Sequence, residues 1–229
     1  MKVKMKKIVI LSLFLMTVLA SAQTTINKKL GDFSEIKIFN GIDVELIKSD
    51  ESKIIISGEK AEKVKVKTSN NTLRVSLKFP ETTAEGKVKV VLYYANNLNI
   101  IDANEGAVIT SKEIKQPKVE IKAQEGAFIN MVVNVKHLKV KSSSGAVIKL
   151  SGSTKNQNVA ADLGGMYHGY NVEVSDMTIV KAGSGSKVEV QAGETLDAKV
   201  SFGGSIFYKG TPEVFKDKKV IGGVIEHRS

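Results

Sequence analysis

The sequence contains no cysteine, no tryptophan and only three histidines. Without cysteine, the chain can form neither disulfides nor thiolate metal sites. Without tryptophan, it lacks the aromatic side chain that sugar-binding platforms favour for stacking. His137, His168 and His227 lie far apart in the sequence and show no spacing typical of metal ligands. We therefore predict that the protein holds no metal ion and no cofactor.

A repeat of about 20 residues organises residues 98–210. Corners of small residues recur six times, and their glycines are spaced 20, 19, 20, 20 and 19 residues apart: Gly106, Gly126, Gly145, Gly165, Gly185 and Gly204. A fixed period of this size is typical of a solenoid. Between corners, apolar and polar residues alternate, as strands with one buried face require. The sequence predicts an all-β fold, a single-domain β-solenoid or parallel β-helix, with right-handed crossovers.

Equivalent positions of successive coils are expected to stack in rows that fill the interior. Three residues after the glycines we expect an inward row: Ile109, Ile129, Ile148, His168, Val188 and Phe207. One residue after the glycines we expect a row of mostly small residues: Ala107, Ala127, Ala146, Met166, Ser186 and Ser205. The fourth and sixth corners each contain two consecutive glycines, so the phase of these coils can slip by one residue.

Residues 33–97 are rich in strand patterns but lack the glycine period. We expect strands at 36–38, 42–46 and 53–56, a turn at Asn40-Gly41, and a hairpin that joins 64–67 to 73–77. This block should start and cap the solenoid, because terminal repeats are atypical. The apolar run at 220–225 reads as a final capping strand in a C-terminal cap of residues 211–229. We expect one domain over residues 23–229.

The first 22 residues have the pattern of a secretory signal peptide. A basic segment is followed by an apolar run, and Ala20-Ser21-Ala22 forms a cleavage site before Gln23. We therefore expect export to the periplasm, the outer-membrane surface or the medium, with no membrane span after cleavage. Four lysines leave with this segment, so 30 basic residues face 24 acidic ones in the mature chain. Its lysines alternate with apolar residues, which indicates a solvated strand face rather than a nucleic-acid site.

No group of residues in the sequence has the pattern of a known catalytic or ligand-binding motif. The glycine corners are not phosphate-binding loops, since they lack a following helix and a Lys-Ser/Thr pair. Glu105 and Glu125 lie one repeat apart and are the best candidates for paired carboxylates, but the next repeat has Ser144 at that position. We interpret them as solvent-facing corner residues and predict no catalytic residues.

Two segments resemble a known family. The entry segment FSEIKIFNGIDVEL at 33–46, the glycine corners and the ending GSIFYKGTPEV at 204–214 are similar to the putative auto-transporter adhesin, head GIN domain family. The resemblance implies an exported β-solenoid protein of the Bacteroidota type with an adhesin role. It brings no catalytic residues with it.

We predict a non-enzymatic surface or periplasmic protein that presents a solenoid face for adhesion or interaction. The sequence does not identify the partner, and a glycan and a cell-surface protein are the candidates. Three aromatic residues are candidates for exposed, ligand-facing positions: Phe128, Tyr167 and Tyr170. The alternative is a polysaccharide-active lyase or hydrolase on a parallel β-helix. Such an enzyme needs clustered carboxylates, calcium ligands or a basic catalytic residue on one face.

Overall fold

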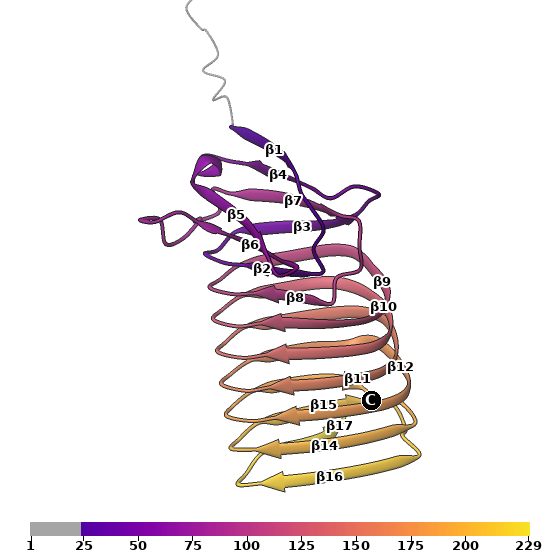
Figure 1. Ribbon diagram of the computed structural model, residues 1–229. Coiled ribbons are helices and arrows are strands. Elements are labelled where there is room, and N and C mark those ends of the chain that lie inside the picture. Colours follow the sequence, from indigo (N-terminus) through magenta and orange to yellow (C-terminus); the bar gives the residue numbers. More distant parts are fainter. Residues whose placement is uncertain (1–23) are drawn as a thin grey trace, which may run out of the picture.

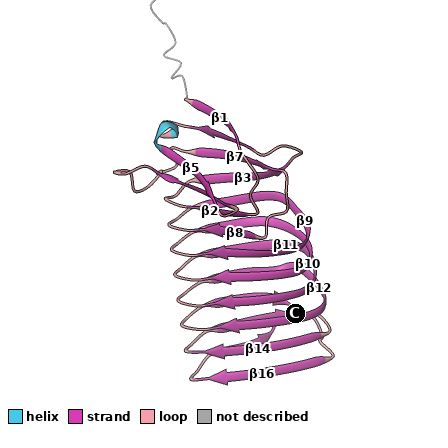
Figure 2. Ribbon diagram, in the orientation of Figure 1, coloured by secondary structure: helices cyan, strands magenta, loops and turns pink. Residues whose placement is uncertain are grey.

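The computed structural model describes residues 24–229 as a stack of β coils (Figure 1). The predicted all-β solenoid is confirmed: 65% of the residues are in strands, and parallel coils of about 19 residues stack for about 7 turns. The only helical element in the described chain is η1 (Ala61–Lys63), a single turn near the upper end (Figure 2). The signal peptide expected at residues 1–22 lies outside the described residues.

Long bent strands build the middle of the stack. They are β9 (Val108–Ala123), β10 (Phe128–Ser142), β11 (Val147–Ala161) and β12 (Met166–Ala182). The first part of each strand pairs in one sheet and the last part in a second sheet, so each strand wraps around the interior. Further down, separate strands serve the two sheets: β13 (Lys187–Gln191), β14 (Thr195–Ser201), β15 (Ser205–Lys209), β16 (Val214–Val220) and β17 (Val224–His227).

Each of these coils turns through a corner of two residues with positive φ. The second residue is glycine at all seven corners from β8 to β17: Gly106, Gly126, Gly145, Gly164, Gly185, Gly203 and Gly222. Neighbouring corners are hydrogen-bonded, as where the Gly106 N–H donates to the Glu125 carbonyl at 2.9 Å. The apolar run at 220–225, expected to be one strand, instead contains the seventh corner at Ile221-Gly222.

The phase does slip at both Gly-Gly corners, so the glycines Gly165 and Gly204 chosen from sequence are one residue late. Leu163 and Phe202 occupy the first corner position with φ of 48°, which bulky side chains rarely adopt. The second glycine of each pair is needed for space. A Cβ on Gly165 would lie 2.4 Å from the Ser142 carbonyl oxygen, and one on Gly204 would lie 2.6 Å from that of Ala182.

The slip changes the predicted rows. The inward row contains Tyr167 and Ile206 in place of His168 and Phe207, and all its members are fully buried: Ile109, Ile129, Ile148, Tyr167, Val188 and Ile206. The small row likewise contains Gly165 and Gly204 in place of Met166 and Ser205. The large Tyr167 ring fits because Gly169 lies against it; a Cβ there would come within 2.4 Å of the ring.

The N-terminal strands form coils out of chain order. Strands β2 (Glu35–Ile38) and β3 (Asp43–Lys48) make one coil. Strand β8 (Ile100–Ala103) begins the coil that continues into β9. Strands β2 and β3 stack directly on β8 and β9, with the Gly41 N–H donating to the Glu105 carbonyl at 2.8 Å. The later strands β6 (Thr72–Leu77) and β7 (Lys89–Tyr94) pair with the other edges of β2 and β3. The chain therefore first adds a coil toward the N-terminal end of the stack, and then continues from β8 toward the C-terminal end.

Antiparallel strands close this upper end. β4 (Lys53–Ser57) pairs with β7, and β1 (Thr25–Lys29) pairs with β4. The predicted hairpin is confirmed: β5 (Val64–Ser69) pairs antiparallel with β6 across Asn70-Asn71.

At the other end of the stack, Asp217 and Lys219 of β16 stack on Ala198 and Val200 of the neighbouring strand β14. Charges at positions that are apolar in other coils disfavour the addition of a further strand.

Candidate functional site

One sheet of the solenoid carries a long row of cations. It comprises β5, β6, β2, β8, the last parts of β9 to β12, β14 and β16, and we call it the basic sheet. Strand register aligns one residue from each of these ten strands in a single row: Lys67, Arg74, Lys37, Asp102, Lys122, Lys141, Ala160, Lys181, Lys199 and Lys218. Since neighbouring strands lie about 4.8 Å apart, this basic row is about 43 Å long.

The upper part of the basic row is partly neutralised. Asp102, which is buried, lies 3.9 Å from the Lys37 ammonium and 3.4 Å from that of Lys122. Glu120 lies 3.0 Å from the Lys141 ammonium and 3.3 Å from that of Lys139. These ion pairs offset the repulsion between stacked lysines.

The lower part of the row has no such compensation. Lys181, Lys199 and Lys218 lie on three consecutive strands, are exposed, and form no ion pair within 4.0 Å among residues 24–229. Like charges directly opposite one another destabilise a sheet. An anionic ligand would relieve this repulsion, so the lower row is the part of the molecule best prepared for one.

The pKa of Glu120 reflects its two lysine partners. Burial alone would raise this pKa, but hydrogen bonds and charge from Lys141 and Lys139 outweigh that effect and hold the pKa below its ordinary value. The same hydrogen bond raises the pKa of Lys141. Glu120 therefore stays ionised at neutral pH and keeps Lys141 occupied.

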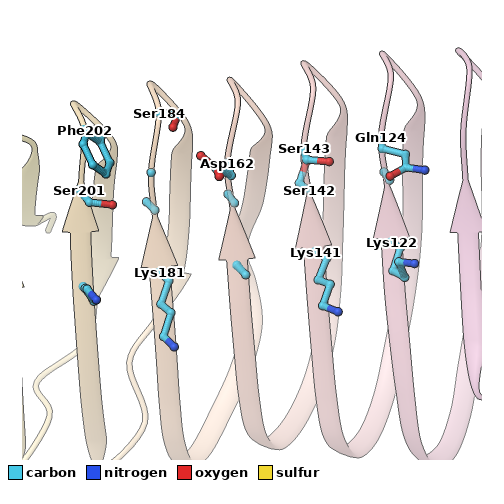
Figure 3. A pocket seen from close by; sticks show the side chains of 16 residues that line it. Lys122, Gln124, Lys141, Ser142, Ser143, Asp162, Lys181, Ser184, Ser201 and Phe202 are labelled. Atoms are coloured by element: carbon cyan, nitrogen blue, oxygen red, sulfur yellow. The ribbon is translucent and has the colours of Figure 1, made fainter.

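A groove of about 490 Å³ runs beside the basic row, between it and the corners. Figure 3 shows lysines along one side and polar side chains near the corners. The positions on the corner side lie two residues after the row positions and therefore face the same way; four of the five are polar: Gln124, Ser143, Asp162, Gly183 and Ser201. Ala160 and Gly183 are the small members of these two sets of positions, and both line the groove.

Phe202 stands at one end of this groove (Figure 3). The residue is 60% exposed, and its backbone is in the left-handed region at a corner position that is serine or glutamate in four other coils and Leu163 or Ile221 in two. Of these three bulky corner residues, only Phe202 lines the groove. A bulky residue in this conformation costs free energy and persists where something else requires it. Its place on the groove wall makes ligand contact a reason for it.

A second depression of about 590 Å³ opens on the basic sheet near the other ends of the same strands. Asn99, Asn156 and Asn158 line it together with the apolar Met177 and Ile179. Of its two lysines, Lys139 is already paired with Glu120, whereas Lys118 forms no ion pair within 4.0 Å in the described residues. This depression offers fewer free charges than the groove.

Of the three aromatic residues predicted to face a ligand, two lie at the surface and one is buried. Phe128 and Tyr170 are half-buried and line one depression of about 550 Å³ on the opposite sheet. Tyr167 is fully buried in the inward row, where its hydroxyl lies 3.5 Å from the Gln157 side-chain oxygen and burial raises its pKa. The expectation that Tyr167 is exposed is therefore wrong, because the phase of its coil slips by one residue.

Most charges around the Phe128 and Tyr170 depression are paired, and only Lys149 among its lining residues lacks an ion pair within 4.0 Å in the described chain. His168 faces outward, not inward as expected, and its Nδ1 lies 2.7 Å from Glu189 Oε2. The Lys187 ammonium lies 2.6 Å from the other Glu189 oxygen. Burial alone would raise the pKa of Glu189, but these two partners lower it below its ordinary value. This depression is thus less prepared for a charged ligand than the groove.

Glu105 and Glu125 are exposed at consecutive corners, and Glu105 accepts a hydrogen bond from the Asn40 amide at 2.6 Å. Across residues 24–229, no three His, Asp or Glu side chains gather in a way that could hold a metal ion. Within the same range, no helix has the length and apolar character needed to cross a bilayer.

Comparison with known proteins identifies the family. The model of the putative auto-transporter adhesin, head GIN domain family matches residues 32–212. The chain belongs to this family. Comparison with curated proteins finds no match.

Solved structures share the fold at low sequence identity. A putative adhesin from Bacteroides fragilis is 19% identical with a TM-score of 0.81, over 90% of this chain and 97% of that one. A putative adhesin from Parabacteroides distasonis is 19% identical with a TM-score of 0.68, over 90% and 97% of the two chains. A protein from the same organism described as a putative lipid binding protein is 17% identical with a TM-score of 0.68, over the same shares. At this level of identity, the likeness shows a shared fold.

The basic row was not predicted from the sequence, because the strand lysines were interpreted as a solvated face. The spacing between the lysines and the corners would have revealed it. Counting back three residues from the first residue of each corner gives the row: Lys37, Asp102, Lys122, Lys141, Ala160, Lys181, Lys199 and Lys218. The count requires the correct phase at Leu163 and Phe202, where the glycine pattern alone is one residue late.

Proposed function

We propose that this protein is an exported, non-enzymatic attachment module that binds extended anionic ligands at a cell surface or in the periplasm. The observation that carries the proposal is the unpaired lower part of the basic row, Lys181, Lys199 and Lys218. Three lysines without ion pairs, on neighbouring strands about 4.8 Å apart, form a regular array for repeating negative charge.

Several features support this proposal. The ligand would lie across the strands and contact several coils at once, which suits attachment better than turnover. The signal-peptide pattern in the sequence of residues 1–22 favours export. The family and its adhesin-named structural relatives support the attachment role. One structural relative is described as a putative lipid binding protein. Those lipids that have anionic headgroups carry the same sign of charge as acidic glycans.

Binding to dextran sulfate, with neutral dextran as the matched uncharged polymer, tests the proposal. We expect the protein to bind only the sulfated polymer, and less at physiological salt than at low salt. Replacing Lys181, Lys199 and Lys218 together by serine should weaken binding at least about tenfold.

The control removes the same number of charges elsewhere. Lys115, Lys136 and Lys149 are exposed lysines outside the basic row, and their triple serine variant should bind nearly as well as the parent. Equal losses in the two triple variants would mean that net charge alone drives binding and would contradict the proposal. Export is checked separately, by the mass of the protein recovered from the producing cells, which should begin at Gln23.

A further inference from the structure

We propose that the groove beside the basic row binds a linear acidic polysaccharide, a chain of uronate sugars that runs across the coils. This inference rests on the proposed attachment function and names its ligand class. The groove combines three chemistries that such a chain requires: cations for carboxylates, polar groups for hydroxyls, and an apolar surface for a sugar ring.

The cations are the first requirement. Lys181 and Lys199 lie on adjacent strands at the edge of the groove, and neither forms an ion pair in the described part of the chain. Lys122 and Lys141 line the same groove but are already paired with acidic residues. Carboxylates of successive sugars would therefore bind first at Lys181 and Lys199, through charge-assisted hydrogen bonds.

The polar groups lie on the opposite side of the groove. Gln124, Ser143 and Ser201 can each donate and accept hydrogen bonds, and Asp162 can accept from a sugar hydroxyl (Figure 3). Their side chains follow the same spacing from coil to coil as the lysines. A polymer with hydroxyls along one edge and carboxylates along the other matches this arrangement, whereas a polyphosphate lacks the hydroxyls.

The depth of the groove comes from its small residues. Ala160 replaces a lysine between Lys141 and Lys181, and Gly183 lies beside Asp162 and Ser201. A long side chain at either position would fill the space. The groove therefore accepts a polymer of some thickness, beyond what charge attraction at a flat surface would need.

Phe202 supplies the apolar surface. Its exposed ring at the end of the groove can cover the C–H face of a sugar, which removes apolar area from water. This contact would offset the backbone strain at its corner. A single aromatic is too few for single-stranded nucleic acid, which stacks successive bases on several rings.

The decisive experiment uses protein expressed from the full sequence, and calorimetric titration with oligogalacturonate and with alginate oligomers. The methyl-esterified oligogalacturonate serves as the uncharged counterpart. We expect binding of at least one acidic oligomer and none of the ester. Ala160→Gln, which fills the groove without a change in charge, and Phe202→Ser should each weaken binding about tenfold, the loss of about 1.4 kcal/mol.

Two control variants match these changes. Leu163→Ser alters an exposed apolar residue at another strained corner; Leu163 follows the lining residue Asp162 but does not itself line the groove. Lys149→Gln removes a charge from the opposite sheet. Both should bind like the parent. Circular dichroism of every variant confirms that the fold is kept.

Other outcomes would overturn the inference. If dextran sulfate binds through the basic row but Ala160→Gln and Phe202→Ser have no effect, the ligand lies on the surface of the row; the attachment function then stands and the groove proposal fails. If anionic lipid vesicles bind and neither oligomer does, the partner is a membrane surface. If no anionic polymer or vesicle binds, both proposals fail.

Discussion

The inward and outward rows of this solenoid share one repeat but behave in opposite ways when they stack. Inward, each apolar side chain meets a like neighbour in the next coil and is removed from water, as Ile129, Ile148 and Tyr167 show. Outward, the same stacking places Lys181, Lys199 and Lys218 against one another, and like charges repel. A repeat therefore amplifies whatever each position contributes, stability inside and a charged surface outside.

The largest expected effect tests the inward row at one position. Ile148→Ala removes buried methyl groups between Ile129 and Tyr167 and should lower the free energy of unfolding by about 2–5 kcal/mol. Ile148→Lys should cost more, because it buries an unpaired charge. Chemical denaturation followed by circular dichroism measures both.

The adjacent outward residue provides the control. Lys149 is exposed, and Lys149→Ala should change the free energy of unfolding by less than about 0.5 kcal/mol. Similar small effects at Ile148 and Lys149 would contradict the alternation on which both rows depend.

The corners show how far sequence alone could lead. The period of small residues and glycine predicted the solenoid and most of its rows, because glycine reaches positive φ at little cost. It failed at Leu163 and Phe202, whose side chains are unexpected in the left-handed region. Because of that one-residue error, His168 was predicted to point inward and Tyr167 to be exposed. In the structure Tyr167 is buried and His168 faces outward.

Two further features were beyond the reach of the period. The coil of β6 and β7 lies above that of β2 and β3 although it follows in sequence, and such non-local placement leaves no local pattern. Likewise, Lys67 and Arg74 join the basic row through the β5–β6 hairpin, whose register is not tied to the repeat. Periodicity fixes neighbours within the array but not at its end.

A smaller effect is expected at the last corner, where an outward position is apolar. Ile221 is 71% exposed with φ of 53°, so its side chain gains little from burial while its backbone is strained. Ile221→Gly should raise the free energy of unfolding by about 1 kcal/mol. Gly222→Ala, next to it in the same left-handed region, should lower it by a similar amount, and thermal or chemical denaturation measures both. A loss of stability in Ile221→Gly would show that Ile221 packs in a way its exposure does not suggest.

The smallest effect concerns the ion pairs that separate the upper from the lower part of the basic row. Because the pKa of Glu120 is below its ordinary value in the folded protein, its ionised form stabilises the fold above the unfolded pKa. That contribution is lost as the pH falls through the folded pKa. Glu120→Gln should therefore lower the free energy of unfolding at neutral pH by less than about 1 kcal/mol. The difference should vanish well below the ordinary glutamate pKa of about 4.3. Denaturation at neutral pH and at a pH well below about 4.3 measures this difference, with Glu173→Gln as the control, since Glu173 is exposed and forms no ion pair in the described chain.

Glu120→Gln also releases Lys141, so it should strengthen binding to dextran sulfate. Weaker binding would mean that Glu120 orients the lysines more than it neutralises them.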